Sequence, residues 1–314
     1  LYTALQCAKN GVTFVIDHHA SPNAVRGSLD VIAEAFDHVG VSHLLCYELS
    51  DRDGEKSATA GLEETEAYLQ NRQGLVGLHA SFTVGDDLLS KAGDLMYDYD
   101  AGVHVHVAEE FVDQHDCRDK YGCRVAERFR DVGIFSSPKS ILAHCLHLDD
   151  HEKSILAESP AWIAQNSESN LNKNVGSFDG RGFNNILLGT DGMNRDMLRS
   201  AQAAYFSGQR TEAVSPQEIY RRFRNAHRYL AQNKFSGDGD NNLVILDYDS
   251  PTEINQDNFL SHFIYGLESR HVESVISDGR LIVQDRKLLT FDEDGILDFA
   301  GDMGARLWRE MQKR

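Results

Sequence analysis

The sequence has little basic charge and no long apolar run. Lysine and arginine total 31 against 49 aspartate and glutamate residues, which gives a net charge of −18. Such a surface repels phosphate backbones and anionic lipids, so we expect neither nucleic acid nor membrane as a partner. No stretch approaches the roughly 18 apolar residues of a membrane span. The N-terminus also has no basic stretch followed by an apolar signal core, so we expect a cytoplasmic location.

The cysteines also exclude two classes of protein. The five are scattered without the short paired spacings of a zinc ribbon or the density of a secreted scaffold, and they are Cys7, Cys46, Cys117, Cys123 and Cys145. We therefore interpret them as reduced thiols. The 41% apolar and 25% charged residues are typical of soluble globular proteins. A chain of 314 residues can form one barrel or two ordinary domains.

Short apolar runs alternate with helical patterns along the chain. This alternation predicts a parallel sheet with crossover helices. The predicted strands span residues 12–16, 44–47, 75–78, 103–107, 141–143, 162–164 and 186–188. Helices are expected at 27–39, 119–132 and 215–233. Further along, we expect strands at 243–246 and 271–283. An amphipathic helix is expected at 295–314, and its predicted packing residues are Leu297, Ala300, Ala305, Leu307, Trp308 and Met311.

Ionisable residues follow several of the predicted strands. They are found in Asp17-His18-His19, at His79, in His106-Val107-Ala108-Glu109, at His144 and at Asp191. In barrels of parallel strands, residues at the carboxyl ends of the strands build the active site. The sequence therefore predicts that these side chains lie at one rim of the sheet.

The segment from Val103 to Glu109 is the most informative of these. Alternate side chains of a strand point to opposite faces, so His104 and His106 share one face. A neutral imidazole binds zinc or iron well, and Glu109, just past the strand, can reach a substrate atom above the metal. The alternative is a surface strand that happens to contain two histidines.

Two further strands each deliver one ionisable residue. His144 follows the apolar run 141–143, although a lone histidine there is more often a core residue. Asp191 follows 186–188 between Gly189 and Gly192, and we expect the glycines to leave room for a metal and water. Asp191 could instead cap the next helix.

In this order and spacing, the three motifs resemble the amidohydrolase superfamily, in the branch of chlorohydrolases and of cytosine and guanine deaminases. Residues 17–23 and 46–54 look closest to the SsnA subgroup of aminohydrolases. The resemblance implies an α/β fold, a TIM-like (β/α)8 barrel of the metal-dependent hydrolase type that lacks its first strand, with a partial β-sandwich. We expect the barrel at 1–237, and half of the sandwich with a terminal helix at 238–314.

The resemblance also implies roles for individual residues. His106, His144 and Asp191 would hold one divalent metal, zinc or else iron, and Asp191 would take the proton of the attacking water. Glu109 would protonate the ring nitrogen or the leaving group, and His144 would orient the water. His79 and His19 are expected to bind the substrate, although His79 could simply pack against the strand below.

The expected function is deamination of a nitrogen heterocycle or amidine-like small molecule at a non-peptide C–N bond, by an enzyme that resemblance suggests is a homodimer. Amide hydrolysis or hydrolytic dechlorination on the same barrel is the first alternative. The second is a non-catalytic fragment, because members of the superfamily carry a His-x-His pair on the first barrel strand, before the position where this sequence starts. No lysine at the end of the strand over 75–78 is available to bridge two metals, which favours a single ion.

Overall fold

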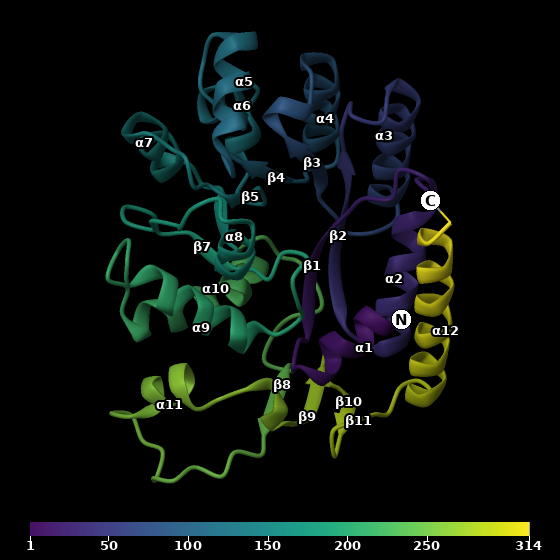
Figure 1. Cartoon of the computed structure of the whole chain (residues 1–314), viewed down its shortest axis with the longest axis vertical. Coiled ribbons are helices and arrows are strands. Elements are labelled where there is room, and N and C mark those ends of the chain that lie inside the picture. Colours follow the sequence, from purple (N-terminus) through teal and green to yellow (C-terminus); the bar gives the residue numbers. More distant parts are fainter. Residues whose placement is uncertain (314) are drawn as a thin grey trace.

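The computed structural model describes residues 1–313 and contains two sheets surrounded by helices (Figure 1). The larger sheet has seven parallel strands in the order β1-β2-β3-β4-β5-β6-β7. They are β1 Phe14–His19, β2 Ser42–Leu49, β3 Val76–Ala80, β4 Val103–Val107, β5 Ile141–His144, β6 Trp162–Gln165 and β7 Ile186–Leu188. All seven predicted strands are present. Each is hydrogen-bonded to its sequence neighbour, the arrangement expected of a curled barrel sheet.

Helices follow the strands and surround the sheet (Figure 1). They are α2 Ser28–Val39, α3 Glu55–Leu69, α4 Asp86–Asp98, α5 Phe111–Tyr121, α6 Val125–Asp131, α7 Asp150–Glu158, α8 Ser167–Lys173, α9 Met197–Gly208 and α10 Pro216–Gln232. The single helix predicted at 119–132 is wrong. Gly122 adopts a left-handed conformation with φ of 71° and ends α5, and a new helix starts after Arg124.

The inner face of the sheet is filled at its amino end. Trp162 packs edge-on against Tyr229 of α10, with 5.7 Å between ring centroids, and Tyr229 donates a hydrogen bond to the Lys139 carbonyl at 2.7 Å. Leu44, Ile141 and other apolar side chains complete this layer. Because the amino end is closed by apolar packing, polar groups can gather only at the carboxyl end.

A smaller antiparallel sheet lies beside the first, with strand order β11-β10-β9-β8. Its strands are β8 Leu243–Leu246, β9 Val272–Ser277, β10 Arg280–Gln284 and β11 Lys287–Leu288. The predicted boundary near residue 237 falls between α10 and β8. Two further short helices are α1 Tyr2–Lys9, before β1, and α11 Phe259–Tyr265, between β8 and β9.

The last helix, α12 Glu293–Met311, runs along α2 in Figure 1 and contacts α1. Its predicted packing residues are mostly wrong, because Leu297, Leu307, Trp308 and Met311 are exposed while Ile296 is buried. Ala300 is half-buried and Ala305 is exposed. Contact is made at the start of the helix, where Glu293 pairs with Lys9, so the apolar stripe beyond it remains uncovered. Within residues 1–313, no helix is both long and apolar enough to cross a bilayer.

Candidate metal centre

Three strands leave the sheet through left-handed residues at the predicted site. Ala108 after β4, His144 at the end of β5 and Asp191 after β7 have φ values of 46°, 73° and 50°. Residues other than glycine rarely adopt this conformation, and its cost is characteristic of functional sites. The backbone is therefore bent at the three positions that precede or carry Glu109, His144 and Asp191.

Asp113 of α5 holds the first of these bends. Its carboxylate accepts the backbone N–H of Ala108 at 2.9 Å and that of Phe82 at 3.1 Å. Burial raises the pKa of Asp113 to about 6, although the two hydrogen bonds act in the opposite direction. The loop that carries Glu109 is thus fixed by a buried acid with no predicted role in the chemistry.

The structure brings Glu109, His144 and Asp191 together. One ligand atom from each lies within 4.8 Å of the others. His144 Nε2 is 3.7 Å from Glu109 Oε1 and 3.9 Å from Asp191 Oδ2. These are the residues for which the sequence predicted catalytic roles, and they come from three different strand ends.

His144 is held so that one ring nitrogen faces this group. Its Nδ1 lies 2.8 Å from Asn170 Oδ1, which can only accept, so the proton resides on Nδ1. Its Nε2 is buried and has no hydrogen-bond partner among the described residues. Buried polar atoms normally have partners, and a neutral imidazole nitrogen is a metal ligand. The imidazole of His144 and the carboxylate of Asp191 therefore fit two ligands of a divalent cation, with the carboxylate of Glu109 beside them.

Asp191 is kept in its charged form. Burial alone would raise its pKa, but hydrogen bonds from Ser169 Oγ at 2.5 Å and from the Gly192 N–H at 2.7 Å outweigh it. The charge of Lys173 acts in the same direction, so the net pKa is lowered. An ionised carboxylate can bind a metal or accept a proton.

Lys173, at the end of α8, was missed by the sequence analysis. Its Nζ is 2.7 Å from Glu109 Oε1 and 3.8 Å from Asp191 Oδ2. Burial would lower the pKa of Lys173, but the hydrogen bond and charge of Glu109 raise it overall. No motif marks this lysine, because only the packing of α8 against the strand ends brings it there.

His106 lies between this group and a second one. Its ring stacks on that of His144 with centroids 5.4 Å apart, but its ligand atom groups with those of His18 and Glu48, all within 4.8 Å. Neither His18 of β1 nor Glu48 of β2 was predicted to belong to the site. The available signal was that both residues are polar and lie near the ends of strands.

The other histidines occupy different positions. His79 bonds to Thr83 Oγ1 through Nδ1 at 2.6 Å, and its ring lies 5.3 Å from that of His106. Burial and, to a smaller extent, the neighbouring His106 lower the pKa of His79 to about 3, so the His79 ring is neutral.

His19 belongs to neither group and bonds to Ser21 Oγ at 2.9 Å. His104 shares the face of His106 as expected, since both rings approach His18, with centroids 4.8 and 5.0 Å away.

Gly189, two residues before Asp191, does not leave the open space that the sequence predicted. A Cβ atom at Gly189 would lie 2.2 Å from Asn166 Oδ1, so this glycine makes room for a protein side chain and not for metal or water. At Gly192, a Cβ atom would meet nothing within 4 Å. The expectation of open space therefore holds for one glycine only.

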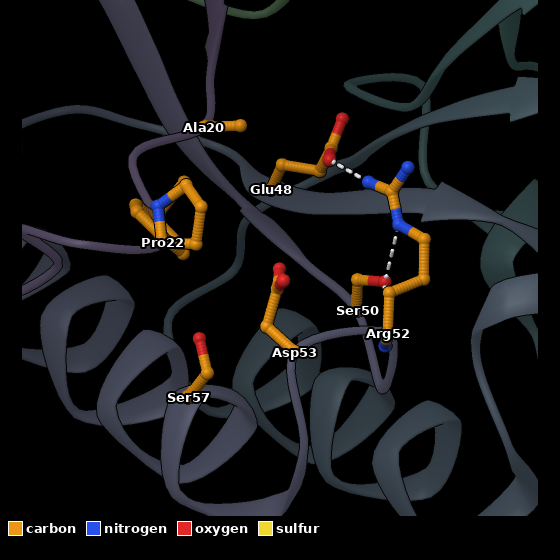
Figure 2. A pocket seen from close by; sticks show the side chains of 8 residues that line it. Ala20, Pro22, Glu48, Ser50, Arg52, Asp53 and Ser57 are labelled. Carbon is orange, nitrogen blue, oxygen red and sulfur yellow. Dashed lines mark hydrogen bonds and ion pairs between the residues drawn. The ribbon is translucent and has the colours of Figure 1, made fainter. Parts of the chain in front are cut away.

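A cavity of about 340 Å³ adjoins the second group at the ends of β1 and β2 (Figure 2). That volume is within the range of small-molecule sites. Glu48 and Arg52 form one wall and Asp53 and Ser57 another, as Figure 2 shows. The remaining lining residues are Ala20, Pro22, Tyr47 and Ser50.

The fold and the clustered ligands define a barrel-type hydrolase, and the sequence comparisons give its family. The amidohydrolase family model matches residues 2–222, so the chain belongs to the amidohydrolase family. A 5'-deoxyadenosine deaminase of Methanococcus maripaludis is 28% identical in an alignment of length 296 that covers 87% of this chain and 70% of the relative. A 5-methylthioadenosine/S-adenosylhomocysteine deaminase of Desulforamulus reducens is 28% identical in an alignment of length 279 that covers 80% of this chain and 64% of that protein.

Solved structures support the fold. An adenosine deaminase from Xanthomonas campestris with bound zinc has a TM-score of 0.81 at 21% identity, covering 98% of this chain and 74% of the other. The guanine deaminase of E. coli has a TM-score of 0.75 at 20% identity, covering 89% and 73%. The predicted TIM-like α/β fold and metal-dependent hydrolase family are confirmed. The family agrees with the predicted class, hydrolases of non-peptide C–N bonds, and the two relatives named above are deaminases. The homodimer, the cytoplasmic location and the SsnA subgroup stay predictions.

Proposed function

We propose that this chain carries out the hydrolytic deamination of a purine nucleoside or a closely similar small molecule, with one divalent metal. The proposal depends most on the unpartnered, buried Nε2 of His144, which faces Glu109 and Asp191. A buried lone pair in that position is stabilised most by a bound cation or by a water molecule that donates a hydrogen bond to it. The deaminase relatives support the same class of reaction.

The metal would be held by His106, His144 and Asp191, and zinc suits two imidazoles and a carboxylate, with iron as the second choice. The backbone carbonyl of His79 accepts from His106 Nδ1 at 2.7 Å, which leaves His106 Nε2 free to bind. When bound, such a metal supplies activated water at neutral pH.

The chain's own residues would then move the protons. Asp191, ionised by its hydrogen bonds, would accept the proton of the attacking water. Glu109 would deliver its proton to the ring nitrogen, and Asp191 would pass the proton taken from water to the departing amine, because the intermediate must lose ammonia and not water. Glu109 would recover a proton from the hydroxyl of the intermediate as ammonia leaves. Lys173 would hold Glu109 in place between turnovers, and His79 would contact the substrate.

The cavity that adjoins the group of His18, Glu48 and His106 favours a substrate with hydroxyl groups next to its heterocycle. The carboxylates of Glu48 and Asp53 accept hydrogen bonds, and the hydroxyls of Ser50 and Ser57 can both donate and accept. Arg52 already bonds to Glu48 Oε1 and to Ser50 Oγ, so a sugar hydroxyl would be recognised mainly by Asp53 and Ser57. We therefore propose a nucleoside in preference to a free base.

Ammonia release provides the test. The 314-residue chain, and the same chain with any coding sequence that precedes Leu1, would be loaded with zinc and given adenosine, 5'-deoxyadenosine, adenine, guanine and cytosine. We expect release from the nucleosides, a loss of about 10²-fold or more in Glu109→Gln, and a selective rise in KM for nucleosides in Asp53→Asn. Release of chloride from a chlorotriazine with no deamination would overturn the proposal. Metal-loaded protein inactive on every C–N substrate would do the same.

A further inference from the structure

The second ligand group lies on the inner face of the sheet at the ends of β1, β2 and β4. His18 and Glu48 are nearly buried, with side chains 12% and 11% exposed. His18 Nδ1 is 3.6 Å from Glu48 Oε2, too far for a good hydrogen bond. One ligand atom each from His18, Glu48 and His106 lies within 4.8 Å of the others. The three side chains therefore converge on a common point without bonding to one another.

Each of these side chains is oriented by a separate partner. His18 Nε2 lies 3.2 Å from the Leu78 carbonyl and His106 Nδ1 lies 2.7 Å from the His79 carbonyl. A carbonyl can only accept, so these nitrogens carry the protons and the opposite nitrogens carry lone pairs. Arg52 Nη2 donates to Glu48 Oε1 at 2.5 Å, which leaves Oε2 on the side of the histidines.

Outer partners of this kind are typical of metal ligands. A histidine ligand normally donates its other N–H to a carbonyl or carboxylate, and a ligating carboxylate is itself hydrogen-bonded. In this group, all three side chains have such a partner. Two imidazoles and one carboxylate, with further positions open, suit iron(II), zinc or cobalt(II).

We propose that His18, Glu48 and His106 form a second binding site for a divalent transition metal, separate from the group of Glu109, His144 and Asp191. His106 has one free nitrogen and can serve one ion at a time. The two sites therefore compete for His106, and an ion at the second site would lie beside the cavity lined by Glu48. The proposal does not depend on the deamination reaction.

Cobalt(II) binding to the Asp191→Asn chain tests the second site while the first is disabled. Absorption spectroscopy would show the coordination of the bound cobalt, and equilibrium dialysis would give the number of ions bound per chain and their affinity. We expect about one bound cobalt per chain. Adding His18→Ala or Glu48→Gln should weaken binding at least tenfold. Adding Arg52→Gln, which frees the carboxylate of Glu48, should weaken it about tenfold as lost outer partners do.

The matched control is His104→Gln in the same background. His104 lies on the same strand as His106 and against His18 but outside the group, so cobalt affinity should not change. Thermal melting without metal identifies any variant that fails to fold. If the His18 or Glu48 variant does not fold, the cobalt affinity of the Arg52→Gln variant decides the test. The proposal is overturned if Asp191→Asn binds cobalt no better than its double variants, or if His104→Gln weakens binding as much as Glu48→Gln. Neither result depends on ammonia release.

Discussion

The two tryptophans of this chain lie in opposite surroundings. Trp162 of β6 is 1% exposed inside the curled sheet, while Trp308 of α12 is 64% exposed on a helix with a bare apolar stripe. The sequence patterns around both predict packing, yet only the first is packed. Along the parallel sheet, the apolar side chains are covered, whereas the apolar stripe of α12 is exposed. Periodicity therefore identifies the apolar face of an element but not whether something covers it.

Replacing Trp162 should have the largest effect on stability. Trp162→Ala removes the ring that packs on Tyr229 and should cost about 3–5 kcal/mol of unfolding free energy, as for other buried aromatics. Urea unfolding followed by circular dichroism measures this. Trp162→Phe is a milder variant for the case in which alanine prevents folding. If Trp162→Ala lowered the free energy of unfolding by less than 1 kcal/mol, Trp162 would not be the closely packed side chain that distinguishes it from Trp308.

At the rim of the same sheet, Asp191→Asn should reduce kcat/KM for deamination by about 10²- to 10⁴-fold, because the amide cannot accept the water proton. Asparagine tolerates a left-handed backbone, so the melting temperature should hardly change. Steady-state kinetics and thermal melting, measured together, separate the two effects. An active Asp191→Asn enzyme would remove Asp191 from the chemistry.

Asp113 predicts a pH dependence of stability. Its folded pKa, about 6, is above its unfolded value, so its contribution is full below about pH 4 and is lost as the pH rises through 6. One proton corresponds to about 1.4 kcal/mol per pH unit, or roughly 2–3 kcal/mol in total. Asp113→Asn should remove this slope, and urea unfolding between pH 4 and 7 measures it. Asp119→Asn, exposed on the same helix, is the control and should keep the slope.

Lys173→Met should have a smaller effect, on the order of 1 kcal/mol or about fivefold in kcat/KM, because the lysine is partly exposed. Loss of its charge removes one of the interactions that lower the pKa of Asp191, so that pKa should rise. The acidic limb of the kcat/KM profile should then move to higher pH. Lys173→Arg should restore most of the activity, and an unchanged profile in the methionine variant would deny the lysine this role.

Trp308→Ala should have the smallest effect. The side chain is exposed and far from the contact between Glu293 and Lys9, so the change in unfolding free energy should stay within about 0.5 kcal/mol. The same urea experiment used for Trp162 measures it. A loss of 2 kcal/mol or more would mean that the stripe on α12 is covered in solution.

Much of the barrel could be predicted because the pattern of each strand is local. The apolar runs identified all seven strands, and the rule that parallel strands share a carboxyl rim placed His106, His144 and Asp191 at one edge. Lys173 could not be found in this way, because its position depends on how α8 packs against the strand ends. Glu48 directly follows the predicted strand over 44–47, so the same rule could have placed it at the rim.

The errors are of two kinds, one in local sequence and two in tertiary packing. The helix predicted at 119–132 ignored Gly122, whose left-handed conformation ends α5, and the apolar periodicity on both sides concealed the break. For α12, the sequence pattern predicted the helix correctly, but the expectation that its apolar face packs against the rest of the protein was wrong. The space expected at Gly189 is occupied by Asn166, from a strand end that precedes it by more than twenty residues.

The left-handed bends at Ala108, His144 and Asp191 restrict which sequences can form this rim. A β-branched residue at any of the three would meet a steric penalty before its chemistry mattered, whereas asparagine and aspartate meet little. At positions 144 and 191, variation is therefore restricted twice, by the backbone conformation and by the need for a side chain that can bind a metal or transfer a proton. The left-handed conformation of His144 has an energetic cost that the surrounding packing outweighs.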